Sequence, residues 1–172
     1  MALRSDGIGV LKLEKKIDSN YIQLDELVKE LPGAGKIVNP LQGKFTTKEI
    51  ADAIKNANLT AEDIDLIIVA TTSQDYPGFP SGACLLQDRL GLRNVGAFDL
   101  AAACSGFNMG LTTATQYVQT GLYKNVLVVA SDCLSRFVDK SDRSICVLFG
   151  DGAAAVVVGE VEEGYGVLAS SL

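Results

Sequence analysis

Short apolar runs alternate with amphipathic stretches over most of this chain. The run DLIIVA at 65–70 carries apolar side chains toward both faces of an extended backbone, which is typical of a strand buried in a parallel sheet. Similar runs near 96–100 and at 126–130 predict two more strands, and helices are predicted near 81–91 and 105–120. Strands separated by helices indicate right-handed βαβ crossovers and therefore a parallel sheet.

The region before the first of these strands is predicted to contain two helices. Apolar positions within 19–31 recur at nearly helical spacing, whereas the Gly- and Pro-rich segment 32–44 is predicted to be an exposed connection. Thr46 and Glu49 then form the capping-box signal of the second helix. A similar signal at 60–63 predicts one further turn before the buried strand.

The last third of the chain changes character. Two apolar runs, 146–149 and 153–159, are joined by Gly150, Asp151 and Gly152, and Asp-Gly between such runs predicts a β-hairpin. The pattern as a whole predicts an α/β fold. Its sheet is mostly parallel, with an antiparallel C-terminal hairpin strand and helices on both faces. We expect the 172 residues to form a single domain.

Composition and charge exclude several classes of function. An apolar fraction of 48% is enough to bury a core, while the net charge of -6 argues against binding to a phosphate backbone. No apolar run reaches the roughly 18 residues of a membrane helix, because Asp151 interrupts the longest candidate, 145–159. The opening MALRSDGIGV lacks the basic flank and apolar centre of a secretory signal. We therefore expect a cytoplasmic protein with neither nucleic acid nor membrane as a partner.

The cysteines and the missing histidines narrow the chemistry. Four cysteines stand at 84, 104, 133 and 146, so no CxxC pair is present for zinc or for a thioredoxin-like redox site. We expect no metal and no cofactor. Reduced thiols are favoured over a disulfide scaffold, which suits short, cysteine-dense secreted chains. The chain has no histidine, so any mechanism that needs an imidazole must obtain it from outside these residues.

Cys104 is the candidate nucleophile. It stands in AFDLAAACSGFNMG (97–110), after a predicted strand and at the start of a predicted helix. Open α/β sheets keep their sites at such strand ends, and a helix N-terminus lowers the pKa of a thiol. The alternative is that Cys104 is a small buried hydrophobe, as are most cysteines in apolar segments. The local sequence leaves both interpretations open.

Residues 64–159 resemble the first half of a β-ketoacyl-[acyl-carrier-protein] synthase III, a thiolase-fold condensing enzyme of fatty acid synthesis. The resemblance rests on AACSGF, the Phe-Pro-Ser turn, the SDR step and LFGDGA, which occur in the family's order. It implies an acyltransferase that takes an acyl group from acyl-CoA onto a cysteine. The acyl group is then condensed with malonyl-carrier protein after decarboxylation, so acyl-CoA and acyl carrier protein are the implied partners.

The resemblance also assigns roles to individual residues. Cys104 matches the acyl-accepting nucleophile, and Arg143 falls where the family contacts the adenine end of CoA. Leu134 and Phe149 match positions that line the acyl pocket, and Phe79 matches a residue donated across the dimer interface. Each has an ordinary structural alternative. The pocket residues would be core, Phe79 would anchor its loop, and Arg143 would pair on the surface with the neighbouring aspartate.

Two departures from the family pattern shape the functional hypothesis. The family's catalytic His and Asn lie in the second half of its duplicated fold, and this chain is expected to correspond to the first half alone. The segment 32–44 also lacks the Trp and Arg with which the family usually clamps CoA.

The small residues of the helix after Cys104 bear on assembly. Gly106, Gly110 and Ala114 are typical of a helix buried on both sides. We therefore expect a homo-oligomer or a complementary chain that supplies the second half.

Three hypotheses remain open at this point. The chain is part of a condensing enzyme, or a non-catalytic half that dimerises or binds an acyl chain or partner, or an α/β scaffold with a buried thiol. The basic residues that could dock an acidic carrier protein are Lys124, Arg136, Lys140 and Arg143.

Overall fold

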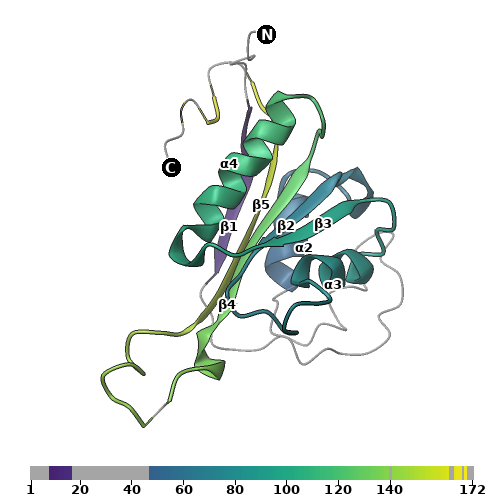
Figure 1. Cartoon of the computed structure of the whole chain (residues 1–172). Coiled ribbons are helices and arrows are strands. Elements are labelled where there is room, and N and C mark those ends of the chain that lie inside the picture. Colours follow the sequence, from purple (N-terminus) through teal and green to yellow (C-terminus); the bar gives the residue numbers. More distant parts are fainter. Residues whose placement is uncertain (1–7, 17–46, 140, 163–164, 168, 170–172) are drawn as a thin grey trace.

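The computed structural model describes residues 8–16, 47–139, 141–162, 165–167 and 169. Within them a five-stranded sheet has the order β1-β5-β4-β2-β3 (Figure 1). The elements in chain order are β1 (Ile8–Lys16), α2 (Thr47–Asn56), β2 (Leu66–Ala70), α3 (Gly82–Arg89), β3 (Gly96–Leu100), α4 (Gly106–Gln119), β4 (Val126–Cys133) and β5 (Asp151–Glu160). The strand and helix alternation predicted from 65 to 130 is confirmed.

The sheet is mostly parallel in strand direction. β2 pairs in parallel with both β3 and β4, while β5 is antiparallel to β4 on one side and to β1 on the other. Four strands therefore point the same way and β5 alone opposes them. The predicted mixture of a parallel sheet with one antiparallel C-terminal strand is confirmed, and β1 joins the sheet from the far end of the sequence.

The predicted hairpin partner of β5 was wrong. Residues 146–148 form turns and Phe149 is irregular, so this run is no strand; the strand that pairs with β5 is β4, with Cys133 opposite Asp151. A long excursion, 134–150, joins the two strands where a tight Asp-Gly turn was predicted. Val147 and Leu148 are largely exposed there, so the apolar run does not enter the core that a strand would need to share.

Alternation of side chains along the strands builds two cores, one on each face. On one face Ile67, Val69 and Leu127 pack with residues of α2 and α3; on the other Ile68 and Val128 pack against α4. This period of two is the geometric property of a pleated strand, and it explains why the strands are apolar throughout. Helices therefore cover both faces, as predicted (Figure 1).

Glycines let α4 lie close to the sheet. A Cβ built on Gly110 would meet Val128 Cγ1 at 3.1 Å, and one on Gly106 would meet Ala70 Cβ at 3.3 Å. With Ala114 they form the buried side of the helix, while Met109 on the same helix stays 38% exposed. Within the described residues one side of α4 packs on the sheet and another is exposed, and burial of that second side by another copy or a complementary chain stays a prediction.

Several predictions concern the N-terminal third. Residues 19–31, 32–44 and Thr46 lie outside the described residues. The capping box at 60–63 is present, since the N–H and hydroxyl of Thr60 both donate to Asp63 Oδ2 at 2.8 Å. Among the helices described, none has the length and apolar character to cross a bilayer.

Candidate active site

The candidate residues converge on one edge of the sheet. Because β2, β3 and β4 run in parallel and in register, their carboxyl ends meet at the same edge, and β5 begins there. Cys104 follows β3, Leu134 follows β4, and Phe149 lies two residues before the first residue of β5. Phe79 lies in the connection from β2 to α3. Loops at the carboxyl ends of parallel strands are where α/β sheets bind ligands.

Cys104 is exposed in a short turn between β3 and α4. The turn is a 3-10 helix, Ala103–Ser105, and α4 begins at the next residue. The Ser105 N–H and hydroxyl both donate to the carbonyl of Ala102, at 3.1 Å and 2.8 Å, and close the turn. The thiol is open to solvent, so the interpretation of Cys104 as a buried hydrophobe was wrong.

The residue before the thiol has an unusual backbone. Ala103 adopts φ 46°, in the left-handed region that a side chain with a Cβ rarely occupies. Such a conformation costs an alanine about 1–2 kcal/mol, and strained residues of this kind cluster at functional sites. The strain lies in the turn that presents Cys104, and no local sequence signal marks it, because Ala has no preference for this conformation.

Phe79 is 86% exposed, so among the described residues its ring does not anchor the loop against the core. The anchor of its loop lies a few residues further on, where Asp99 accepts the N–H groups of Gly82 and Ala83 at 2.8 Å and 2.7 Å. Ser81 caps the same helix by accepting the N–H of Cys84. The carboxylate from β3 thus holds the start of α3, and the apolar ring of Phe79 projects from a fixed base.

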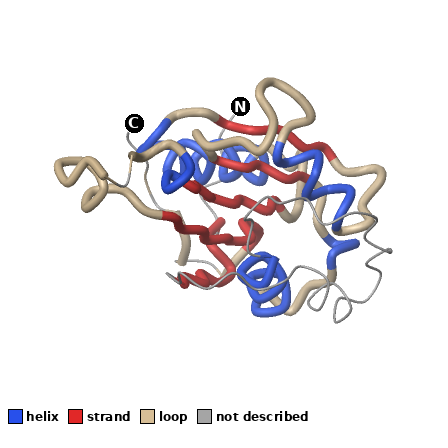
Figure 2. Tube along the Cα trace, turned by 90° about the horizontal axis from the view of Figure 1, so that it is seen from below, coloured by secondary structure: helices blue, strands red, loops and turns tan. Residues whose placement is uncertain are grey.

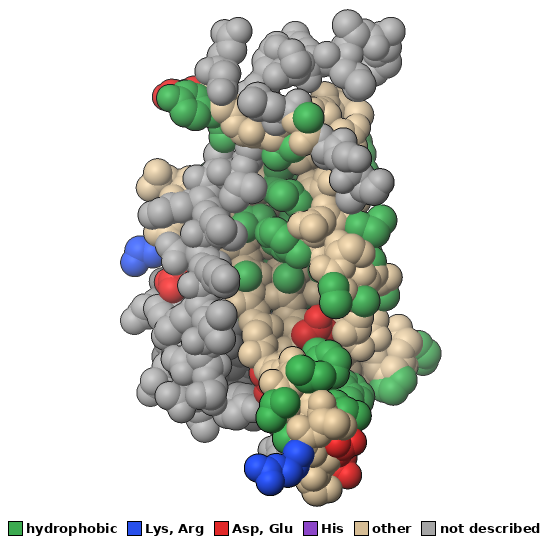
Figure 3. Space-filling model, turned by 90° about the vertical axis from the view of Figure 1, so that its left-hand side faces the viewer, with side chains coloured by type: hydrophobic (Ala, Val, Ile, Leu, Met, Phe, Trp, Pro, Cys, Tyr) green, Lys and Arg blue, Asp and Glu red, His purple; other side chains and the backbone are tan. Residues whose placement is uncertain are grey.

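Residues 137–139 and 141–150 belong to an arm that projects from the carboxyl edge of the sheet (Figures 1 and 2). Its base is the turn Leu134–Arg136, in which Leu134 is half-buried. Phe149 is 51% exposed, so it is not an ordinary core residue. Apolar side chains gather on the arm (Figure 3) and include Phe137, Ile145, Val147, Leu148 and Phe149.

The four basic candidates do not form one patch. Arg143 is exposed on the arm, and its neighbour Asp142 accepts the N–H and hydroxyl of Ser144. Arg136 forms an ion pair with Asp75 at 3.3 Å. Lys124 precedes β4 and therefore lies at the opposite edge of the sheet. Lys140 lies outside the described residues.

Hydrogen bonds within the arm and burial nearby shift several pKa values. The hydroxyl and the N–H of Ser144 lower the pKa of Asp142, and those of Ser141 lower the pKa of Asp139. Burial lowers the pKa of Arg89, which is 5% exposed, and the charge of Asp75 opposes that shift. Asp139 and Asp142 therefore ionise more readily than free aspartates, and their charges stand close in sequence to that of Arg143.

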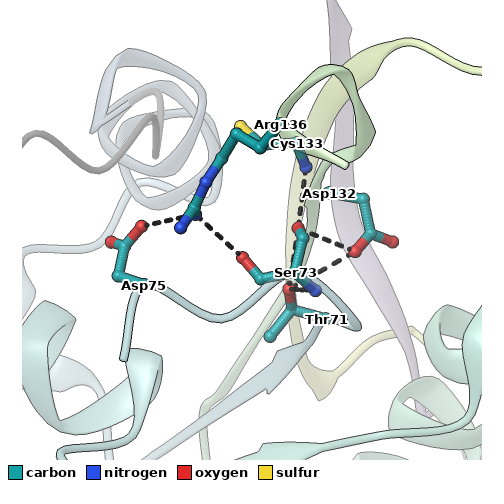
Figure 4. Close-up of polar contacts among 6 residues, drawn as sticks. All are labelled: Thr71, Ser73, Asp75, Asp132, Cys133 and Arg136. Atoms are coloured by element: carbon teal, nitrogen blue, oxygen red, sulfur yellow. Dashed lines mark hydrogen bonds and ion pairs between the residues drawn. The ribbon is translucent and has the colours of Figure 1, made fainter. Parts of the chain in front are cut away.

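A polar cluster behind this edge was missed from the sequence. Asp132 near the end of β4 accepts hydrogen bonds from the residues that follow β2, and Figure 4 shows Thr71 and Ser73 turned toward it. The signal available was an acidic residue at the end of an apolar strand, in ASD, and it recurs in AFDL at Asp99. No group of three or more His, Cys, Asp or Glu able to hold a metal occurs in the described part of the chain.

Comparison with known proteins agrees with the resemblance seen in the sequence. Residues 98–172 match the family described as 3-oxoacyl-[acyl-carrier-protein (ACP)] synthase III. The β-ketoacyl-[acyl-carrier-protein] synthase III of Oceanobacillus iheyensis is 49% identical over 162 residues, covering 93% of this chain and 51% of the relative. A Bacillus cereus protein named β-ketoacyl-[acyl-carrier-protein] synthase III 1 is 55% identical over 120 residues, covering 70% and 38%.

Solved structures give the same result for the fold. The 3-oxoacyl-[acyl-carrier-protein] synthase III of Aquifex aeolicus superposes with a TM-score of 0.73 at 38% identity, covering 91% of this chain and 55% of that one. The priming β-ketosynthase of the R1128 polyketide pathway gives a TM-score of 0.71 at 28% identity, covering 91% and 51%. This chain spans about half the length of the relatives that it matches. By sequence and by fold, it belongs to the β-ketoacyl-[acyl-carrier-protein] synthase III family.

Proposed function

We propose that this chain carries the acyl-accepting half of a 3-oxoacyl-[acyl-carrier-protein] synthase III of fatty acid synthesis, with Cys104 as the nucleophile. The observation that carries the proposal is the exposed thiol of Cys104, held in a strained turn at the carboxyl edge of the sheet. A thiol in that position is accessible to a substrate, and the start of α4 offers its partial positive charge to the thiolate.

The first chemical step is transfer of an acyl group from acyl-CoA. The Cys104 sulfur attacks the thioester carbonyl, and a tetrahedral intermediate forms and collapses with cleavage of the carbon–sulfur bond to CoA. The enzyme holds the acyl group as a new thioester. CoA leaves as its thiol and takes the proton that Cys104 gives up, so atoms and charge balance without a cofactor.

The proposed roles of the other residues follow from their places at the same edge. Leu134 at the base of the arm and Phe149 at its end bracket the start of β5, and we propose that they line the acyl chain. Arg143 on the arm is exposed and is proposed to meet the adenine end of CoA. The exposed ring of Phe79 is proposed to enter the pocket of a second copy.

The second step requires groups from outside these residues. Condensation with malonyl-carrier protein builds negative charge on a thioester oxygen, which preformed hydrogen-bond donors must meet. The chain has no histidine, and it spans about half of its relatives' length. We therefore propose that a complementary segment or chain supplies the His and Asn of the condensation step, and that acyl carrier protein docks on the assembled enzyme.

Intact-protein mass spectrometry after incubation with acetyl-CoA and longer acyl-CoAs tests the first step. A mass gain equal to the acyl group is expected in the wild type and in Cys84→Ala, which removes the other exposed cysteine. Cys104→Ala should show no gain. Absence of an adduct in a folded wild-type chain, or an adduct that survives in Cys104→Ala, would contradict the assignment of the nucleophile.

A non-catalytic assembly module is the second candidate. It is favoured by the apolar side chains exposed on the arm, of which Val147 is 77% and Leu148 71% exposed. In that case the protein would sediment as an oligomer, and Val147→Asp would dissociate it. Incubation with acyl-CoA would leave the mass of the protein unchanged.

A further inference from the structure

Asp132 is the hub of a hydrogen-bonded cluster that none of the proposed catalytic roles uses. Its Oδ1 accepts the N–H and hydroxyl of Thr72, at 2.8 Å and 2.9 Å, and the hydroxyl of Ser73 at 3.1 Å. The Thr71 hydroxyl lies 3.4 Å from the same oxygen. No hydrogen bond to Oδ2 of Asp132 occurs within the described residues. One carboxylate oxygen therefore holds the whole turn that follows β2.

That turn is joined to the segment that carries the thiol. The N–H of Thr71 donates to the carbonyl of Leu100 at 3.2 Å. Leu100 ends β3, and the three alanines after it lead directly to Cys104. The position of the turn at 71–73 therefore sets where the chain leaves β3 on its way to the nucleophile.

The same turn is joined on its other side to the base of the arm. The hydroxyl of Ser73 accepts the N–H of Cys133 at 2.7 Å, and the carbonyl of Ser73 accepts Arg136 Nη1 at 3.4 Å (Figure 4). Arg136 also pairs with Asp75, so it ties the short helical turn that begins at Leu134 to the chain after β2. The Ser73 side chain is buried, and it both donates to Asp132 and accepts from the backbone.

We propose that Asp132 is a positioning residue that sets the spacing between the Cys104 thiol and the apolar side chain of Leu134 at the base of the arm. This spacing thereby selects the length of the substrate's alkyl chain that can lie beside the thiol. A carboxylate that accepts several hydrogen bonds at once holds its donors more firmly than neutral acceptors would. That the substrate group is an acyl group rests on the proposed function, whereas the spacing between the thiol and the base of the arm does not.

The test measures how fast Cys104 reacts with N-alkylmaleimides that carry a short or a long alkyl group, with peptide mass spectrometry to separate Cys104 from the other cysteines. The ratio of the two rates reports the space around the thiol, and it is measured on variants whose circular dichroism shows them to be folded. We expect Asp132→Ala to change this ratio at least about fivefold, the effect of losing one hydrogen bond of ordinary strength. Asp132→Asn should restore the ratio, because its amide oxygen can replace Oδ1 and no partner is lost at Oδ2.

Asp65 provides a matched control at the opposite edge of the sheet. Its Oδ2 accepts the backbone N–H groups of Lys124 and Asn125 at 2.8 Å and 2.9 Å, so Asp65→Ala also removes a carboxylate that holds a strand end. This variant should leave the ratio unchanged. A wild-type ratio in Asp132→Ala, or an equal change in Asp65→Ala, would overturn the proposal.

Ser73→Ala keeps the proposal testable should Asp132→Ala fail to fold. It removes the hydroxyl that joins Asp132 to the N–H of Cys133, and it should shift the ratio in the same direction. An unshifted ratio in folded Ser73→Ala would also count against the proposal. Because the maleimides need no acyl-CoA chemistry, a chain that fails to accept an acyl group would refute the proposed function and leave this test intact.

Discussion

Ser135 and Asp151 close the neck of the arm between β4 and β5. The Ser135 N–H donates to one carboxylate oxygen of Asp151 at 2.9 Å, and its hydroxyl donates to the other at 2.7 Å. These two hydrogen bonds therefore join the two ends of the arm where it leaves the sheet and returns to it. The Asp-Gly pair, which in the sequence resembles a hairpin turn, is instead the start of β5, with Asp151 as its first residue.

Ser135→Ala should loosen the arm without unfolding the sheet. It removes the hydroxyl bond to Asp151 and keeps the backbone bond, a loss of about 1 kcal/mol at the neck. Hydrogen exchange followed by mass spectrometry should be faster within 137–149 and unchanged in the β2 strand. Faster exchange throughout the sheet, or none in the arm, would contradict this role. Ser144→Ala, which removes a hydroxyl bond inside the arm, is the control for a purely local change.

Asp99→Ala should destabilise the protein by about 2 kcal/mol, because two N–H groups of α3 lose a charged acceptor. Asp99→Asn keeps one acceptor oxygen and should lose about half as much. Urea denaturation measures both. Glu62→Ala, at an exposed carboxylate, should remain within about 0.5 kcal/mol of the wild type. Equal losses in Asp99→Ala and Glu62→Ala would show that the helix start does not depend on Asp99.

Gly110→Val should cost about 2 kcal/mol, since even a Cβ at this position lies 3.1 Å from Val128 Cγ1 in the packed interface between α4 and the sheet. Gln116→Val, at an exposed position of the same helix, carries the lower helix propensity of valine and the loss of an exposed hydrogen bond to Gln119, together about 0.5 kcal/mol. Thermal unfolding of the two variants separates packing from propensity. Similar midpoints would mean that the helix moves away from the sheet at little cost.

Asp63 should contribute a pH-dependent part of the stability. The N–H of Thr60, and next its hydroxyl, lower the pKa of Asp63 below its ordinary value. A carboxyl whose pKa is lower in the folded state stabilises the protein above its unfolded pKa, and this contribution is lost as the pH falls through the folded pKa.

Asp63→Asn should therefore melt below the wild type near neutral pH, and the gap should close as the solution is acidified. Glu62→Gln removes the same charge one residue away without affecting the bonds to Thr60, and its gap should not follow this course. A gap for Asp63→Asn that is constant with pH would be inconsistent with the lowered pKa.

The sequence by itself determined the local elements and the place of the thiol. The apolar runs at 65–70 and 126–130 predict buried strands, and the structure confirms them: both faces of these strands pack against helices. Cys104 could be placed at the start of α4 because the end of β3 and the small residues after it are local signals. Such patterns depend on the conformational preferences of residues that are neighbours in the sequence, and the sequence shows these directly.

Only the tertiary structure decided which distant segments meet. β5 pairs with β4 across the arm and with β1 from the far end of the chain, and no local pattern specifies a partner for an apolar strand. Asp132 reaches a turn some sixty residues earlier because β4 lies beside β2, and that neighbourhood follows from the packing of helices on both faces of the sheet. The left-handed backbone of Ala103 is likewise imposed from outside, since alanine would not choose it and the surrounding chain must hold it there.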